Sequence, residues 1–389
     1  MNRSDPARLI YLDNAATSHP KPSAVLDSVV TCMTERGGNP GRGSHALALA
    51  AAEDIYACRT LAAALFGLSA HPENVIFTLN TTHALNLAIK GMLAEGDHAV
   101  CSDMEHNSVL RPLYRLQTDG RITFDVFDTY PTAPRRTDSM ILSSLASKIT
   151  QKTKAVICAH TSNLCGATLP IEKIGAFCHE RGIKFIVDAA QSAGVLEIDM
   201  VRMHIDVLCV PGHKGLMGPQ GSGMLILGEG ITLDTLMEGG NGMDSLSGEM
   251  SLDAPERYEA GTLASPAIAG LRAGMEYVRE MGIDRIYRHE TLLGAWARDG
   301  LMALPHVKVY APRQAGGVVL FSVDGYDSEE VGRMLDADGI CVRPGFHCSA
   351  LGHRTLGTSE GGAVRASFGW FNSEEDVDAL LRAMRRIVG

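Results

Sequence analysis

The feature that most constrains the fold is a regular alternation of short apolar runs with helical patterns between Val75 and Leu227. Residues 155–159 form one such run, a helical pattern spans residues 171–181, and a second run follows at 184–188. Strand-length runs that alternate with amphipathic segments predict βαβ units, an α/β fold and a largely parallel sheet. Ligands of such sheets bind beyond the carboxyl ends of the strands, so polar residues directly after each run are candidate site residues.

A polar, glycine-rich loop over residues 238–261 separates this region from the rest of the chain. Two domains are expected for 389 residues, because a single hydrophobic core rarely serves more than about 300 residues. We predict a large domain over 15–262 and a smaller C-terminal α/β domain over 263–389, with segment 1–14 packing on the smaller one. The small domain is predicted from a helix over 265–281, apolar runs at 318–321, 340–343 and 364–368, and helical patterns at 328–338 and 373–388.

Composition and charge exclude several classes of function. The net charge of -10 opposes nucleic-acid binding, which requires basic surface to replace the counterions of the phosphates. The first residues lack the apolar core of a signal peptide, and no later apolar run approaches the ~18 residues of a membrane span. We therefore predict a cytoplasmic protein without nucleic-acid or membrane partners. Its nine cysteines are odd in number and lack CxxC pairs, so most are expected to be reduced, buried and inert.

Thr81 and Thr82 precede a good amphipathic segment over residues 83–93. Their hydroxyls and backbone N–H groups would face an anion, such as a phosphate, at the positive end of that helix. An ordinary N-cap is the alternative interpretation of the same pair.

Asp188 and Lys214 are two further signals at strand ends. Asp188 directly follows four apolar residues, where a charge is costly unless it meets a cation or several hydrogen bonds. A pyridinium nitrogen would meet this requirement, although an acid at this position also caps turns. Lys214 stands in a Gly- and Pro-rich turn that could partly desolvate its amine and lower its pKa toward the range of Schiff-base chemistry.

These residues belong to an ordered series of motifs that extends along nearly the whole chain. The motifs are YLDNAATS at 11–18, NTTHALNL at 80–87, EHN at 105–107, HTSNLCG at 160–166, DAAQ at 188–191, HK at 213–214, YEAGT at 258–262 and RPGFHC at 343–348. The series resembles the fold-type I pyridoxal 5′-phosphate (PLP) enzymes of the class V aminotransferase family, and more narrowly the group II cysteine desulfurases and selenocysteine lyases.

The resemblance implies a PLP-dependent transferase fold, with a mainly parallel, seven-stranded sheet flanked by helices in the large domain. It also implies a homodimer, in which Thr262 reaches the phosphate in the partner's site. A charged ring nitrogen makes the cofactor an electron sink. A side chain stacked flat on the cofactor ring fixes the geometry in which the Cα bond to be broken lies perpendicular to that ring. The roles implied at the cofactor are a covalent bond to Lys214, a pyridinium contact from Asp188, ring stacking by His106, a phenolic-oxygen contact from Gln191, and phosphate contacts from Thr81, Thr82 and His213.

For the substrate, the resemblance implies that Arg365 binds the carboxylate, for which a guanidinium fork is well suited. A salt bridge at the domain interface is the alternative. Asn163 would approach the cofactor oxygen or the substrate carboxylate, and Asn14 would line the edge of the site. Arg343 would either bind the carboxylate or orient the neighbouring loop. Many relatives have a serine where this chain has Gly212, so the phosphate contact of that hydroxyl is not expected here, although a contact from the backbone N–H could remain.

Cys348 narrows the choice among the reactions that this family catalyses. It precedes a segment rich in glycine and in the cations His353 and Arg354, and neighbouring positive charge favours the nucleophilic thiolate. By resemblance, Lys214 takes the Cα proton of L-cysteine, His106 assists proton transfer, and Cys348 takes the sulfur as a persulfide. L-Alanine is then released, and the persulfide passes to a thiol or an acceptor protein. Zinc binding by His347, Cys348 and His353 is disfavoured because the loop has no CxxC pair, so no metal is expected.

Several rival functions remain open at this point. Selenocysteine lyase activity on L-selenocysteine is the nearest rival, since selenium elimination need not use Cys348. Cleavage of another sulfur amino acid or of cysteine sulfinate, transamination and epimerisation are alternatives within the family. A PLP-binding sulfur carrier or scaffold without turnover is the non-enzyme alternative.

Overall fold

The computed structural model describes residues 9–40, 43–129, 137–242, 246–310, 312 and 316–389. Within these residues a mixed sheet of seven strands has the order β2-β8-β7-β6-β5-β3-β4. In this sheet β8 runs opposite to the other six strands, so the predicted mainly parallel, seven-stranded sheet is confirmed. The strands are β2 (Val75–Thr78), β3 (His98–Ser102), β4 (Thr123–Phe127), β5 (Thr153–Ala159), β6 (Lys184–Asp188), β7 (Val207–Pro211) and β8 (Gly223–Leu227).

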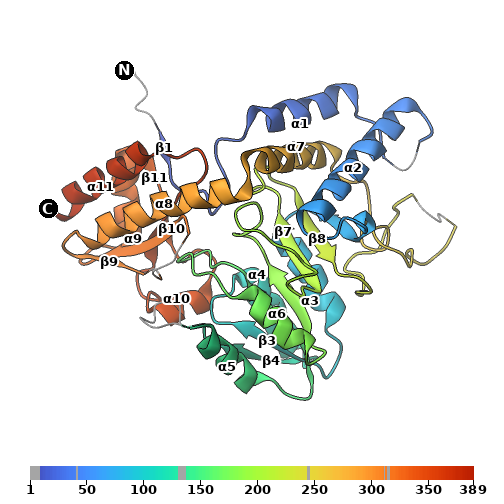
Figure 1. Ribbon diagram of the computed structural model, residues 1–389, viewed down its shortest axis with the longest axis horizontal. Helices are drawn as coiled ribbons and strands as arrows, with labels where there is room; N and C mark the ends of the chain where they lie inside the picture. Colours follow the sequence, from blue (N-terminus) through green and yellow to red (C-terminus); the bar gives the residue numbers. More distant parts are fainter. Residues whose placement is uncertain (1–8, 41–42, 130–136, 243–245, 311, 313–315) are drawn as a thin grey trace.

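Helices cover both faces of this sheet (Figure 1). The central strands are buried along their length, as the continuous apolar runs predict for a sheet covered on both sides. One core cluster joins the sheet to α2, α5, α6 and α7, and a second joins its other face to α3 and α4. The helices are α1 (Ser23–Glu35), α2 (Ala46–Leu65), α3 (Thr81–Met92), α4 (Asn107–Thr118), α5 (Asp138–Lys148), α6 (Ile171–His179) and α7 (Ser265–Met281), with a 3-10 turn η1 at Pro72–Asn74.

The C-terminal part builds a second, smaller core around a four-stranded antiparallel sheet of order β12-β13-β10-β9. Strand β1 (Ile10–Tyr11) pairs with β11 (Ile340–Cys341), which attaches the N-terminal segment to this lobe (Figure 1). Residues 1–8 of the predicted segment lie outside the described residues. The other elements are α8 (Ile283–Met302), β9 (Val307–Val309), β10 (Val318–Val323), α9 (Ser328–Ala337), β12 (Arg343–Gly345), α10 (Ala350–Leu356), β13 (Ala363–Ser367) and α11 (Glu374–Val388).

Three local details differ from the sequence expectations. Helix α8 was not predicted, because His289, Glu290 and two glycines interrupt its apolar face. The run predicted as one strand at 340–343 divides at Val342, since β11 pairs with β1 and β12 pairs with β13. The segment after Cys348 was expected to be a loop but contains helix α10.

The boundary predicted between residues 262 and 263 stays a prediction. Helix α7 follows it in sequence, yet Ile268, Leu271 and Met275 of this helix lie in the core of the large sheet. Helix α7 also packs along α1 (Figure 1). In the described part of the chain, no helix has both the length and the apolar character that crossing a membrane requires.

The topology brings the candidate residues to one edge of the large sheet. Strands β3, β5, β6 and β7 are mutually parallel, so their carboxyl ends lie at the same edge. Asp188 is the last residue of β6, and Lys214 follows β7 by three residues. Arg343 and Arg365 come from β12 and β13 of the smaller lobe.

Candidate active site

The turn that carries Lys214 is fastened through its carbonyl groups. Ser18 Oγ donates to the carbonyl of Lys214 at 3.0 Å. Lys21 Nζ donates to the carbonyl of His213 at 2.8 Å, and Thr17 Oγ1 donates to the same oxygen at 3.0 Å. The N-terminal segment therefore fixes the main chain from which the Lys214 side chain extends.

The Lys214 amine lies in an environment that favours its neutral form. Burial lowers its pKa to about 8, a shift that Asp188 opposes and that Arg365 and Arg343 reinforce. A neutral amine is the form that attacks an aldehyde or takes a proton from carbon. Lys214 is thus suited to both tasks near neutral pH.

Asp188 is a buried carboxylate at the end of β6. Its Oδ1 accepts the Ala190 backbone N–H at 2.9 Å. Burial raises its pKa to about 6, while the Ala190 N–H and Lys214 act in the opposite direction. A cationic ring nitrogen placed beside this carboxylate would stabilise its ionised form.

His106 caps helix α4 and stays neutral. Its Nδ1 accepts the backbone N–H of Ser108 at 3.1 Å, which leaves the ring proton on Nε2. Burial, followed by Lys214 and the arginines, lowers its pKa to about 4. The Ser108 hydroxyl also lies 2.8 Å from His106 Nδ1 and 2.7 Å from Thr82 Oγ1. This contact holds the His106 ring next to the first turn of α3.

The residues expected at a phosphate include two buried polar atoms that lack partners. Among the described residues, neither Thr81 Oγ1 nor His213 Nδ1 has a hydrogen-bond partner. Such atoms are rare in folded proteins and are explained when a ligand satisfies them. Thr81 is the first residue of α3, where backbone N–H groups are also available to an anion.

Two expectations about the residues at this phosphate site are wrong. Thr81 and Thr82 are not the N-cap of α3, because Asn80 occupies that position and its side chain accepts the His83 N–H at 3.0 Å. The backbone N–H of Gly212 is not available to a phosphate, since it donates to the Ser222 carbonyl at 2.9 Å.

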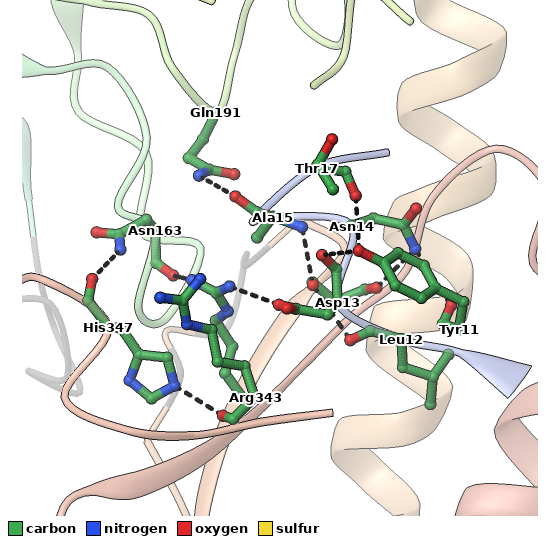
Figure 2. A network of polar contacts seen from close by, with 12 residues as sticks. Tyr11, Leu12, Asp13, Asn14, Ala15, Thr17, Asn163, Gln191, Arg343 and His347 are labelled. Carbon is green, nitrogen blue, oxygen red and sulfur yellow. Dashed lines mark hydrogen bonds and ion pairs between the residues drawn. The ribbon is translucent and has the colours of Figure 1, made fainter. Parts of the chain in front are cut away.

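Three amide side chains link the site to the N-terminal segment and to the Cys348 loop (Figure 2). Gln191 Nε2 donates to the Ala15 carbonyl at 3.0 Å, and Asn163 Nδ2 donates to the His347 carbonyl at 2.8 Å. Asn14 Nδ2 donates to the Ser367 carbonyl at 3.0 Å, so its amide nitrogen attaches the N-terminal segment to β13 of the smaller lobe.

The two arginines form a cationic pair across β12 and β13. Arg343 and Arg365 stand directly opposite in register, which places both side chains on one face of the sheet. Arg365 is 2% exposed and donates to Asp13 Oδ1 at 2.8 Å and to the Asn163 carbonyl at 2.9 Å. Within the described residues, the Arg343 side chain has no hydrogen bond or ion pair. Two adjacent guanidinium groups repel each other, and Asp13 neutralises only one of them. The pair therefore keeps a net positive charge that can bind a carboxylate.

Cys348 differs from the other cysteines in its exposure. All nine lie in the described part of the chain, where seven are buried, Cys341 is intermediate and Cys348 is exposed. Its carbonyl accepts the Asn107 N–H at 2.7 Å, so Cys348 is joined to the residue after His106. The expectation that His353 supplies positive charge here is wrong, because His353 is buried in α10 and its pKa is lowered.

Thr262 is exposed on the surface of the chain. The loop before it is anchored by a buried ion pair between Arg59 and Glu259. Glu259 also accepts the Phe77 backbone N–H at 2.7 Å. This arrangement presents Thr262 outward.

Three residues of the site were not predicted from the sequence. Lys21 is one, and the only available signal was its place three residues after the YLDNAATS motif. Ser108 is another, two residues after His106 at a helix start. Asp13 lies inside the YLDNAATS motif, but its role could not be predicted because it pairs with Arg365, a residue 352 positions away in the sequence.

The fold and the site define an α/β protein in which a lysine and an aspartate interact at the carboxyl edge of a mainly parallel sheet. A family model described as Aminotransferase class-V matches residues 10–380. The chain belongs to this class V aminotransferase family, as its motifs suggested.

Individual relatives are similar over nearly the whole chain. A probable cysteine desulfurase of Methanothermobacter thermautotrophicus is 31% identical over 388 residues, covering 98% of this chain and 95% of the relative. A cysteine desulfurase of Haloferax volcanii is 32% identical over 98% of this chain and 89% of its own length. The apo structure of a cysteine desulfurase from Thermococcus onnurineus matches with a TM-score of 0.87 and 34% identity, covering 98% of this chain and 94% of that one.

Proposed function

We propose that the chain is a PLP-dependent cysteine desulfurase that converts L-cysteine into L-alanine and a persulfide on Cys348. The observation that carries the proposal is the 2.7 Å hydrogen bond from the Asn107 N–H to the Cys348 carbonyl. It places an exposed cysteine next to His106, at the sheet edge that also holds Lys214 and Asp188. Relatives named as cysteine desulfurases cover almost the full chain, which supports the same activity.

The donor set fits PLP. Lys214 would bind the aldehyde, Asp188 the ring nitrogen, and Gln191 the phenolic oxygen, with the His106 ring against the cofactor ring. The partnerless Thr81 Oγ1 and His213 Nδ1, together with Thr82, would hold the phosphate. When bound, the cofactor supplies an electron sink for cleavage of the bond between Cα and its proton.

The protein residues then divide the work on the substrate. Arg343 and Arg365 bind the substrate carboxylate, and Lys214 takes the Cα proton and later returns one. The Cys348 thiolate attacks the substrate sulfur and forms an S–S bond, and the C–S bond breaks with its electron pair left on Cβ, which takes a proton to become the methyl group of alanine. Because Cys348 is exposed, a thiol or an acceptor protein can reach the resulting persulfide.

A homodimer is part of the proposal. Large apolar side chains remain exposed on α1 and α2, where Leu26, Val30, Met33 and Tyr56 are each more than half exposed. The first three recur at helical spacing and form one stripe, which a second copy of the chain would cover. Thr262 is exposed as well and would contact the phosphate of the partner.

The activity test incubates the PLP-loaded protein with L-cysteine and a reducing thiol. We expect alanine and sulfide in equal amounts, because each C–S cleavage yields one of each after the thiol releases the persulfide. A parallel incubation with L-selenocysteine, measuring alanine and selenide, compares the rival substrate. Pyruvate or a racemised amino acid as the main product, without alanine, would contradict the proposal.

Binding of PLP to the cofactor-free protein should depend on pH through Lys214. Only the neutral amine attacks the aldehyde, and burial lowers the Lys214 pKa from 10.5 to about 8. The rate of Schiff-base formation, measured by absorbance, should therefore rise with pH through about 8 and level off near about pH 9. A rise that continued toward pH 10.5, as for an ordinary lysine, would contradict the burial of this amine.

A further inference from the structure

Behind the exposed Cys348, two buried histidines form a continuous line of hydrogen bonds. Thr358 Oγ1 lies 2.7 Å from His353 Nδ1, and His353 Nε2 lies 3.2 Å from His347 Nδ1. His347 Nε2 lies 2.8 Å from the Arg343 carbonyl. The two rings are within 9° of parallel, and both histidines are at least 95% buried.

All hydrogen bonds of this line donate in the same direction, from Thr358 toward the Arg343 carbonyl. The Arg343 carbonyl can only accept, so His347 Nε2 carries the proton and Nδ1 of the neutral ring accepts from His353 Nε2–H. His353 Nδ1 then accepts from the Thr358 hydroxyl. Burial lowers the pKa of His347 to about 3 and also lowers that of His353, in agreement with two neutral rings. Each ring nitrogen of the pair therefore has a hydrogen-bond partner along this line.

The backbone at the end of this line is unusual. His347 and Cys348 have φ values of 51° and 54°, in the left-handed region that side-chain-bearing residues seldom adopt. Such conformations persist only where the surroundings hold them. The large lobe holds the main chain here through Asn163 Nδ2 to the His347 carbonyl and Asn107 N–H to the Cys348 carbonyl.

The His347 side chain supplies the restraint from the other lobe. Its ring contacts the carbonyl of Arg343 (Figure 2) and so connects that residue to the Cys348 backbone. The Arg343 side chain lies opposite Arg365 in the proposed carboxylate site. The histidine pair thus joins the two positions between which the substrate must fit: its carboxylate at Arg343 and its sulfur at Cys348. None of the three relay residues is among the residues assigned to the cofactor.

We propose that Thr358, His353 and His347 form a positioning relay that fixes Cys348 relative to Arg343 and so sets the reach of its sulfur to the substrate sulfur. The inference rests on the proposed desulfurase function and deepens it. The relay acts on sulfur transfer and leaves cofactor binding and Cα deprotonation unchanged. In that step the Cys348 thiolate forms the S–S bond to the substrate sulfur, and the C–S bond breaks with its electron pair left on Cβ, which takes a proton from Lys214 to become the methyl group of alanine.

The test uses Thr358→Val, which removes the hydroxyl while keeping the shape, with Thr358→Ser as the matched control. Two reactions of the PLP-loaded dimer are compared. Persulfide formation on Cys348 from L-cysteine requires the positioned thiolate, whereas loss of chloride from β-chloro-L-alanine requires Lys214 but no nucleophile. His353→Phe, which keeps a ring but removes both nitrogens, is the second variant.

We expect Thr358→Val and His353→Phe to slow persulfide formation about tenfold or more, because small misplacements of a reacting atom are costly. Chloride loss should stay within about twofold of wild type, as should both reactions of Thr358→Ser. An equal fall of both reactions in Thr358→Val, or no fall in either, would overturn the relay.

Hydrogen–deuterium exchange of the cofactor-free protein gives a readout independent of activity. The peptide containing residues 346–349 should exchange faster in Thr358→Val than in Thr358→Ser, while the peptide with Lys214 stays unchanged. Unchanged exchange at 346–349 would contradict the restraint. If wild type itself formed no persulfide, the proposed function would fail, and the exchange comparison would still decide whether the relay holds the loop.

Discussion

Replacing Lys214 with alanine is expected to remove the covalent bond to PLP and to lower desulfurase activity by at least about a thousandfold. The substitution deletes both the amine that binds the aldehyde and the base that takes the Cα proton. The turn itself should survive, because its contacts with Ser18 and Lys21 use the carbonyls of residues 213 and 214. The effect is measured by the absorbance of the bound cofactor and by borohydride reduction, which converts a Schiff base into a stable covalent label.

The matched control is Lys173→Ala, which changes an exposed lysine whose amine pairs with Asp138 at 2.7 Å on the surface. This variant should keep full borohydride labelling and activity. Labelling that persisted at wild-type level in Lys214→Ala would show that another amine binds the cofactor, and the cofactor assignment would be wrong.

Replacing Cys348 with serine is expected to lower alanine formation from L-cysteine by about a hundredfold or more, since a hydroxyl is a far weaker nucleophile than a thiolate. Exchange of the Cα proton with solvent should continue, because Lys214 performs that step. Serine preserves the size of the side chain and the contact of the Cys348 carbonyl with Asn107. The measurements are alanine and sulfide release together with Cα exchange followed by NMR.

Cys341→Ser serves as the control for general damage to this region. Cys341 is the next most exposed cysteine and lies in β11, where its side chain has no part in the proposed transfer. Its replacement should leave alanine formation within about twofold of wild type. Full cysteine desulfurase activity in Cys348→Ser would exclude the persulfide mechanism.

The order and type of the main elements could be predicted because each is encoded locally. The continuous apolar runs that became β5, β6 and β7 are typical of strands buried on both faces. The strand-end rule then selected Asp188 and Lys214, and the structure brings both to the same edge of the sheet.

What could not be predicted depends on contacts between distant segments. Arg365 was assigned to the carboxylate with a salt bridge as the alternative, and the structure shows that Asp13 already occupies one side of its guanidinium. The sequence does not encode a pairing between two segments so far apart in a form that periodicity detects.

Residues 349–362 illustrate the same limit at short range. The glycines and cations there predicted a short, restrained loop in which His353 is a cation. Packing decides otherwise, because helix α10 buries His353 between Thr358 and His347. A histidine that seemed to serve the thiolate by its charge is instead neutral and serves the backbone through hydrogen bonds.

The central claim is that Cys348 takes sulfur directly from the substrate, and a single-turnover reaction tests it most directly. The PLP-loaded protein is mixed with less than one equivalent of L-cysteine that carries isotopically heavy sulfur, alkylated at once and digested. Mass spectrometry should then find one heavy sulfur atom on the peptide that contains Cys348, in an amount equal to the alanine formed. Alanine formation with no heavy sulfur on that peptide, or with the sulfur on another cysteine, would contradict the claim.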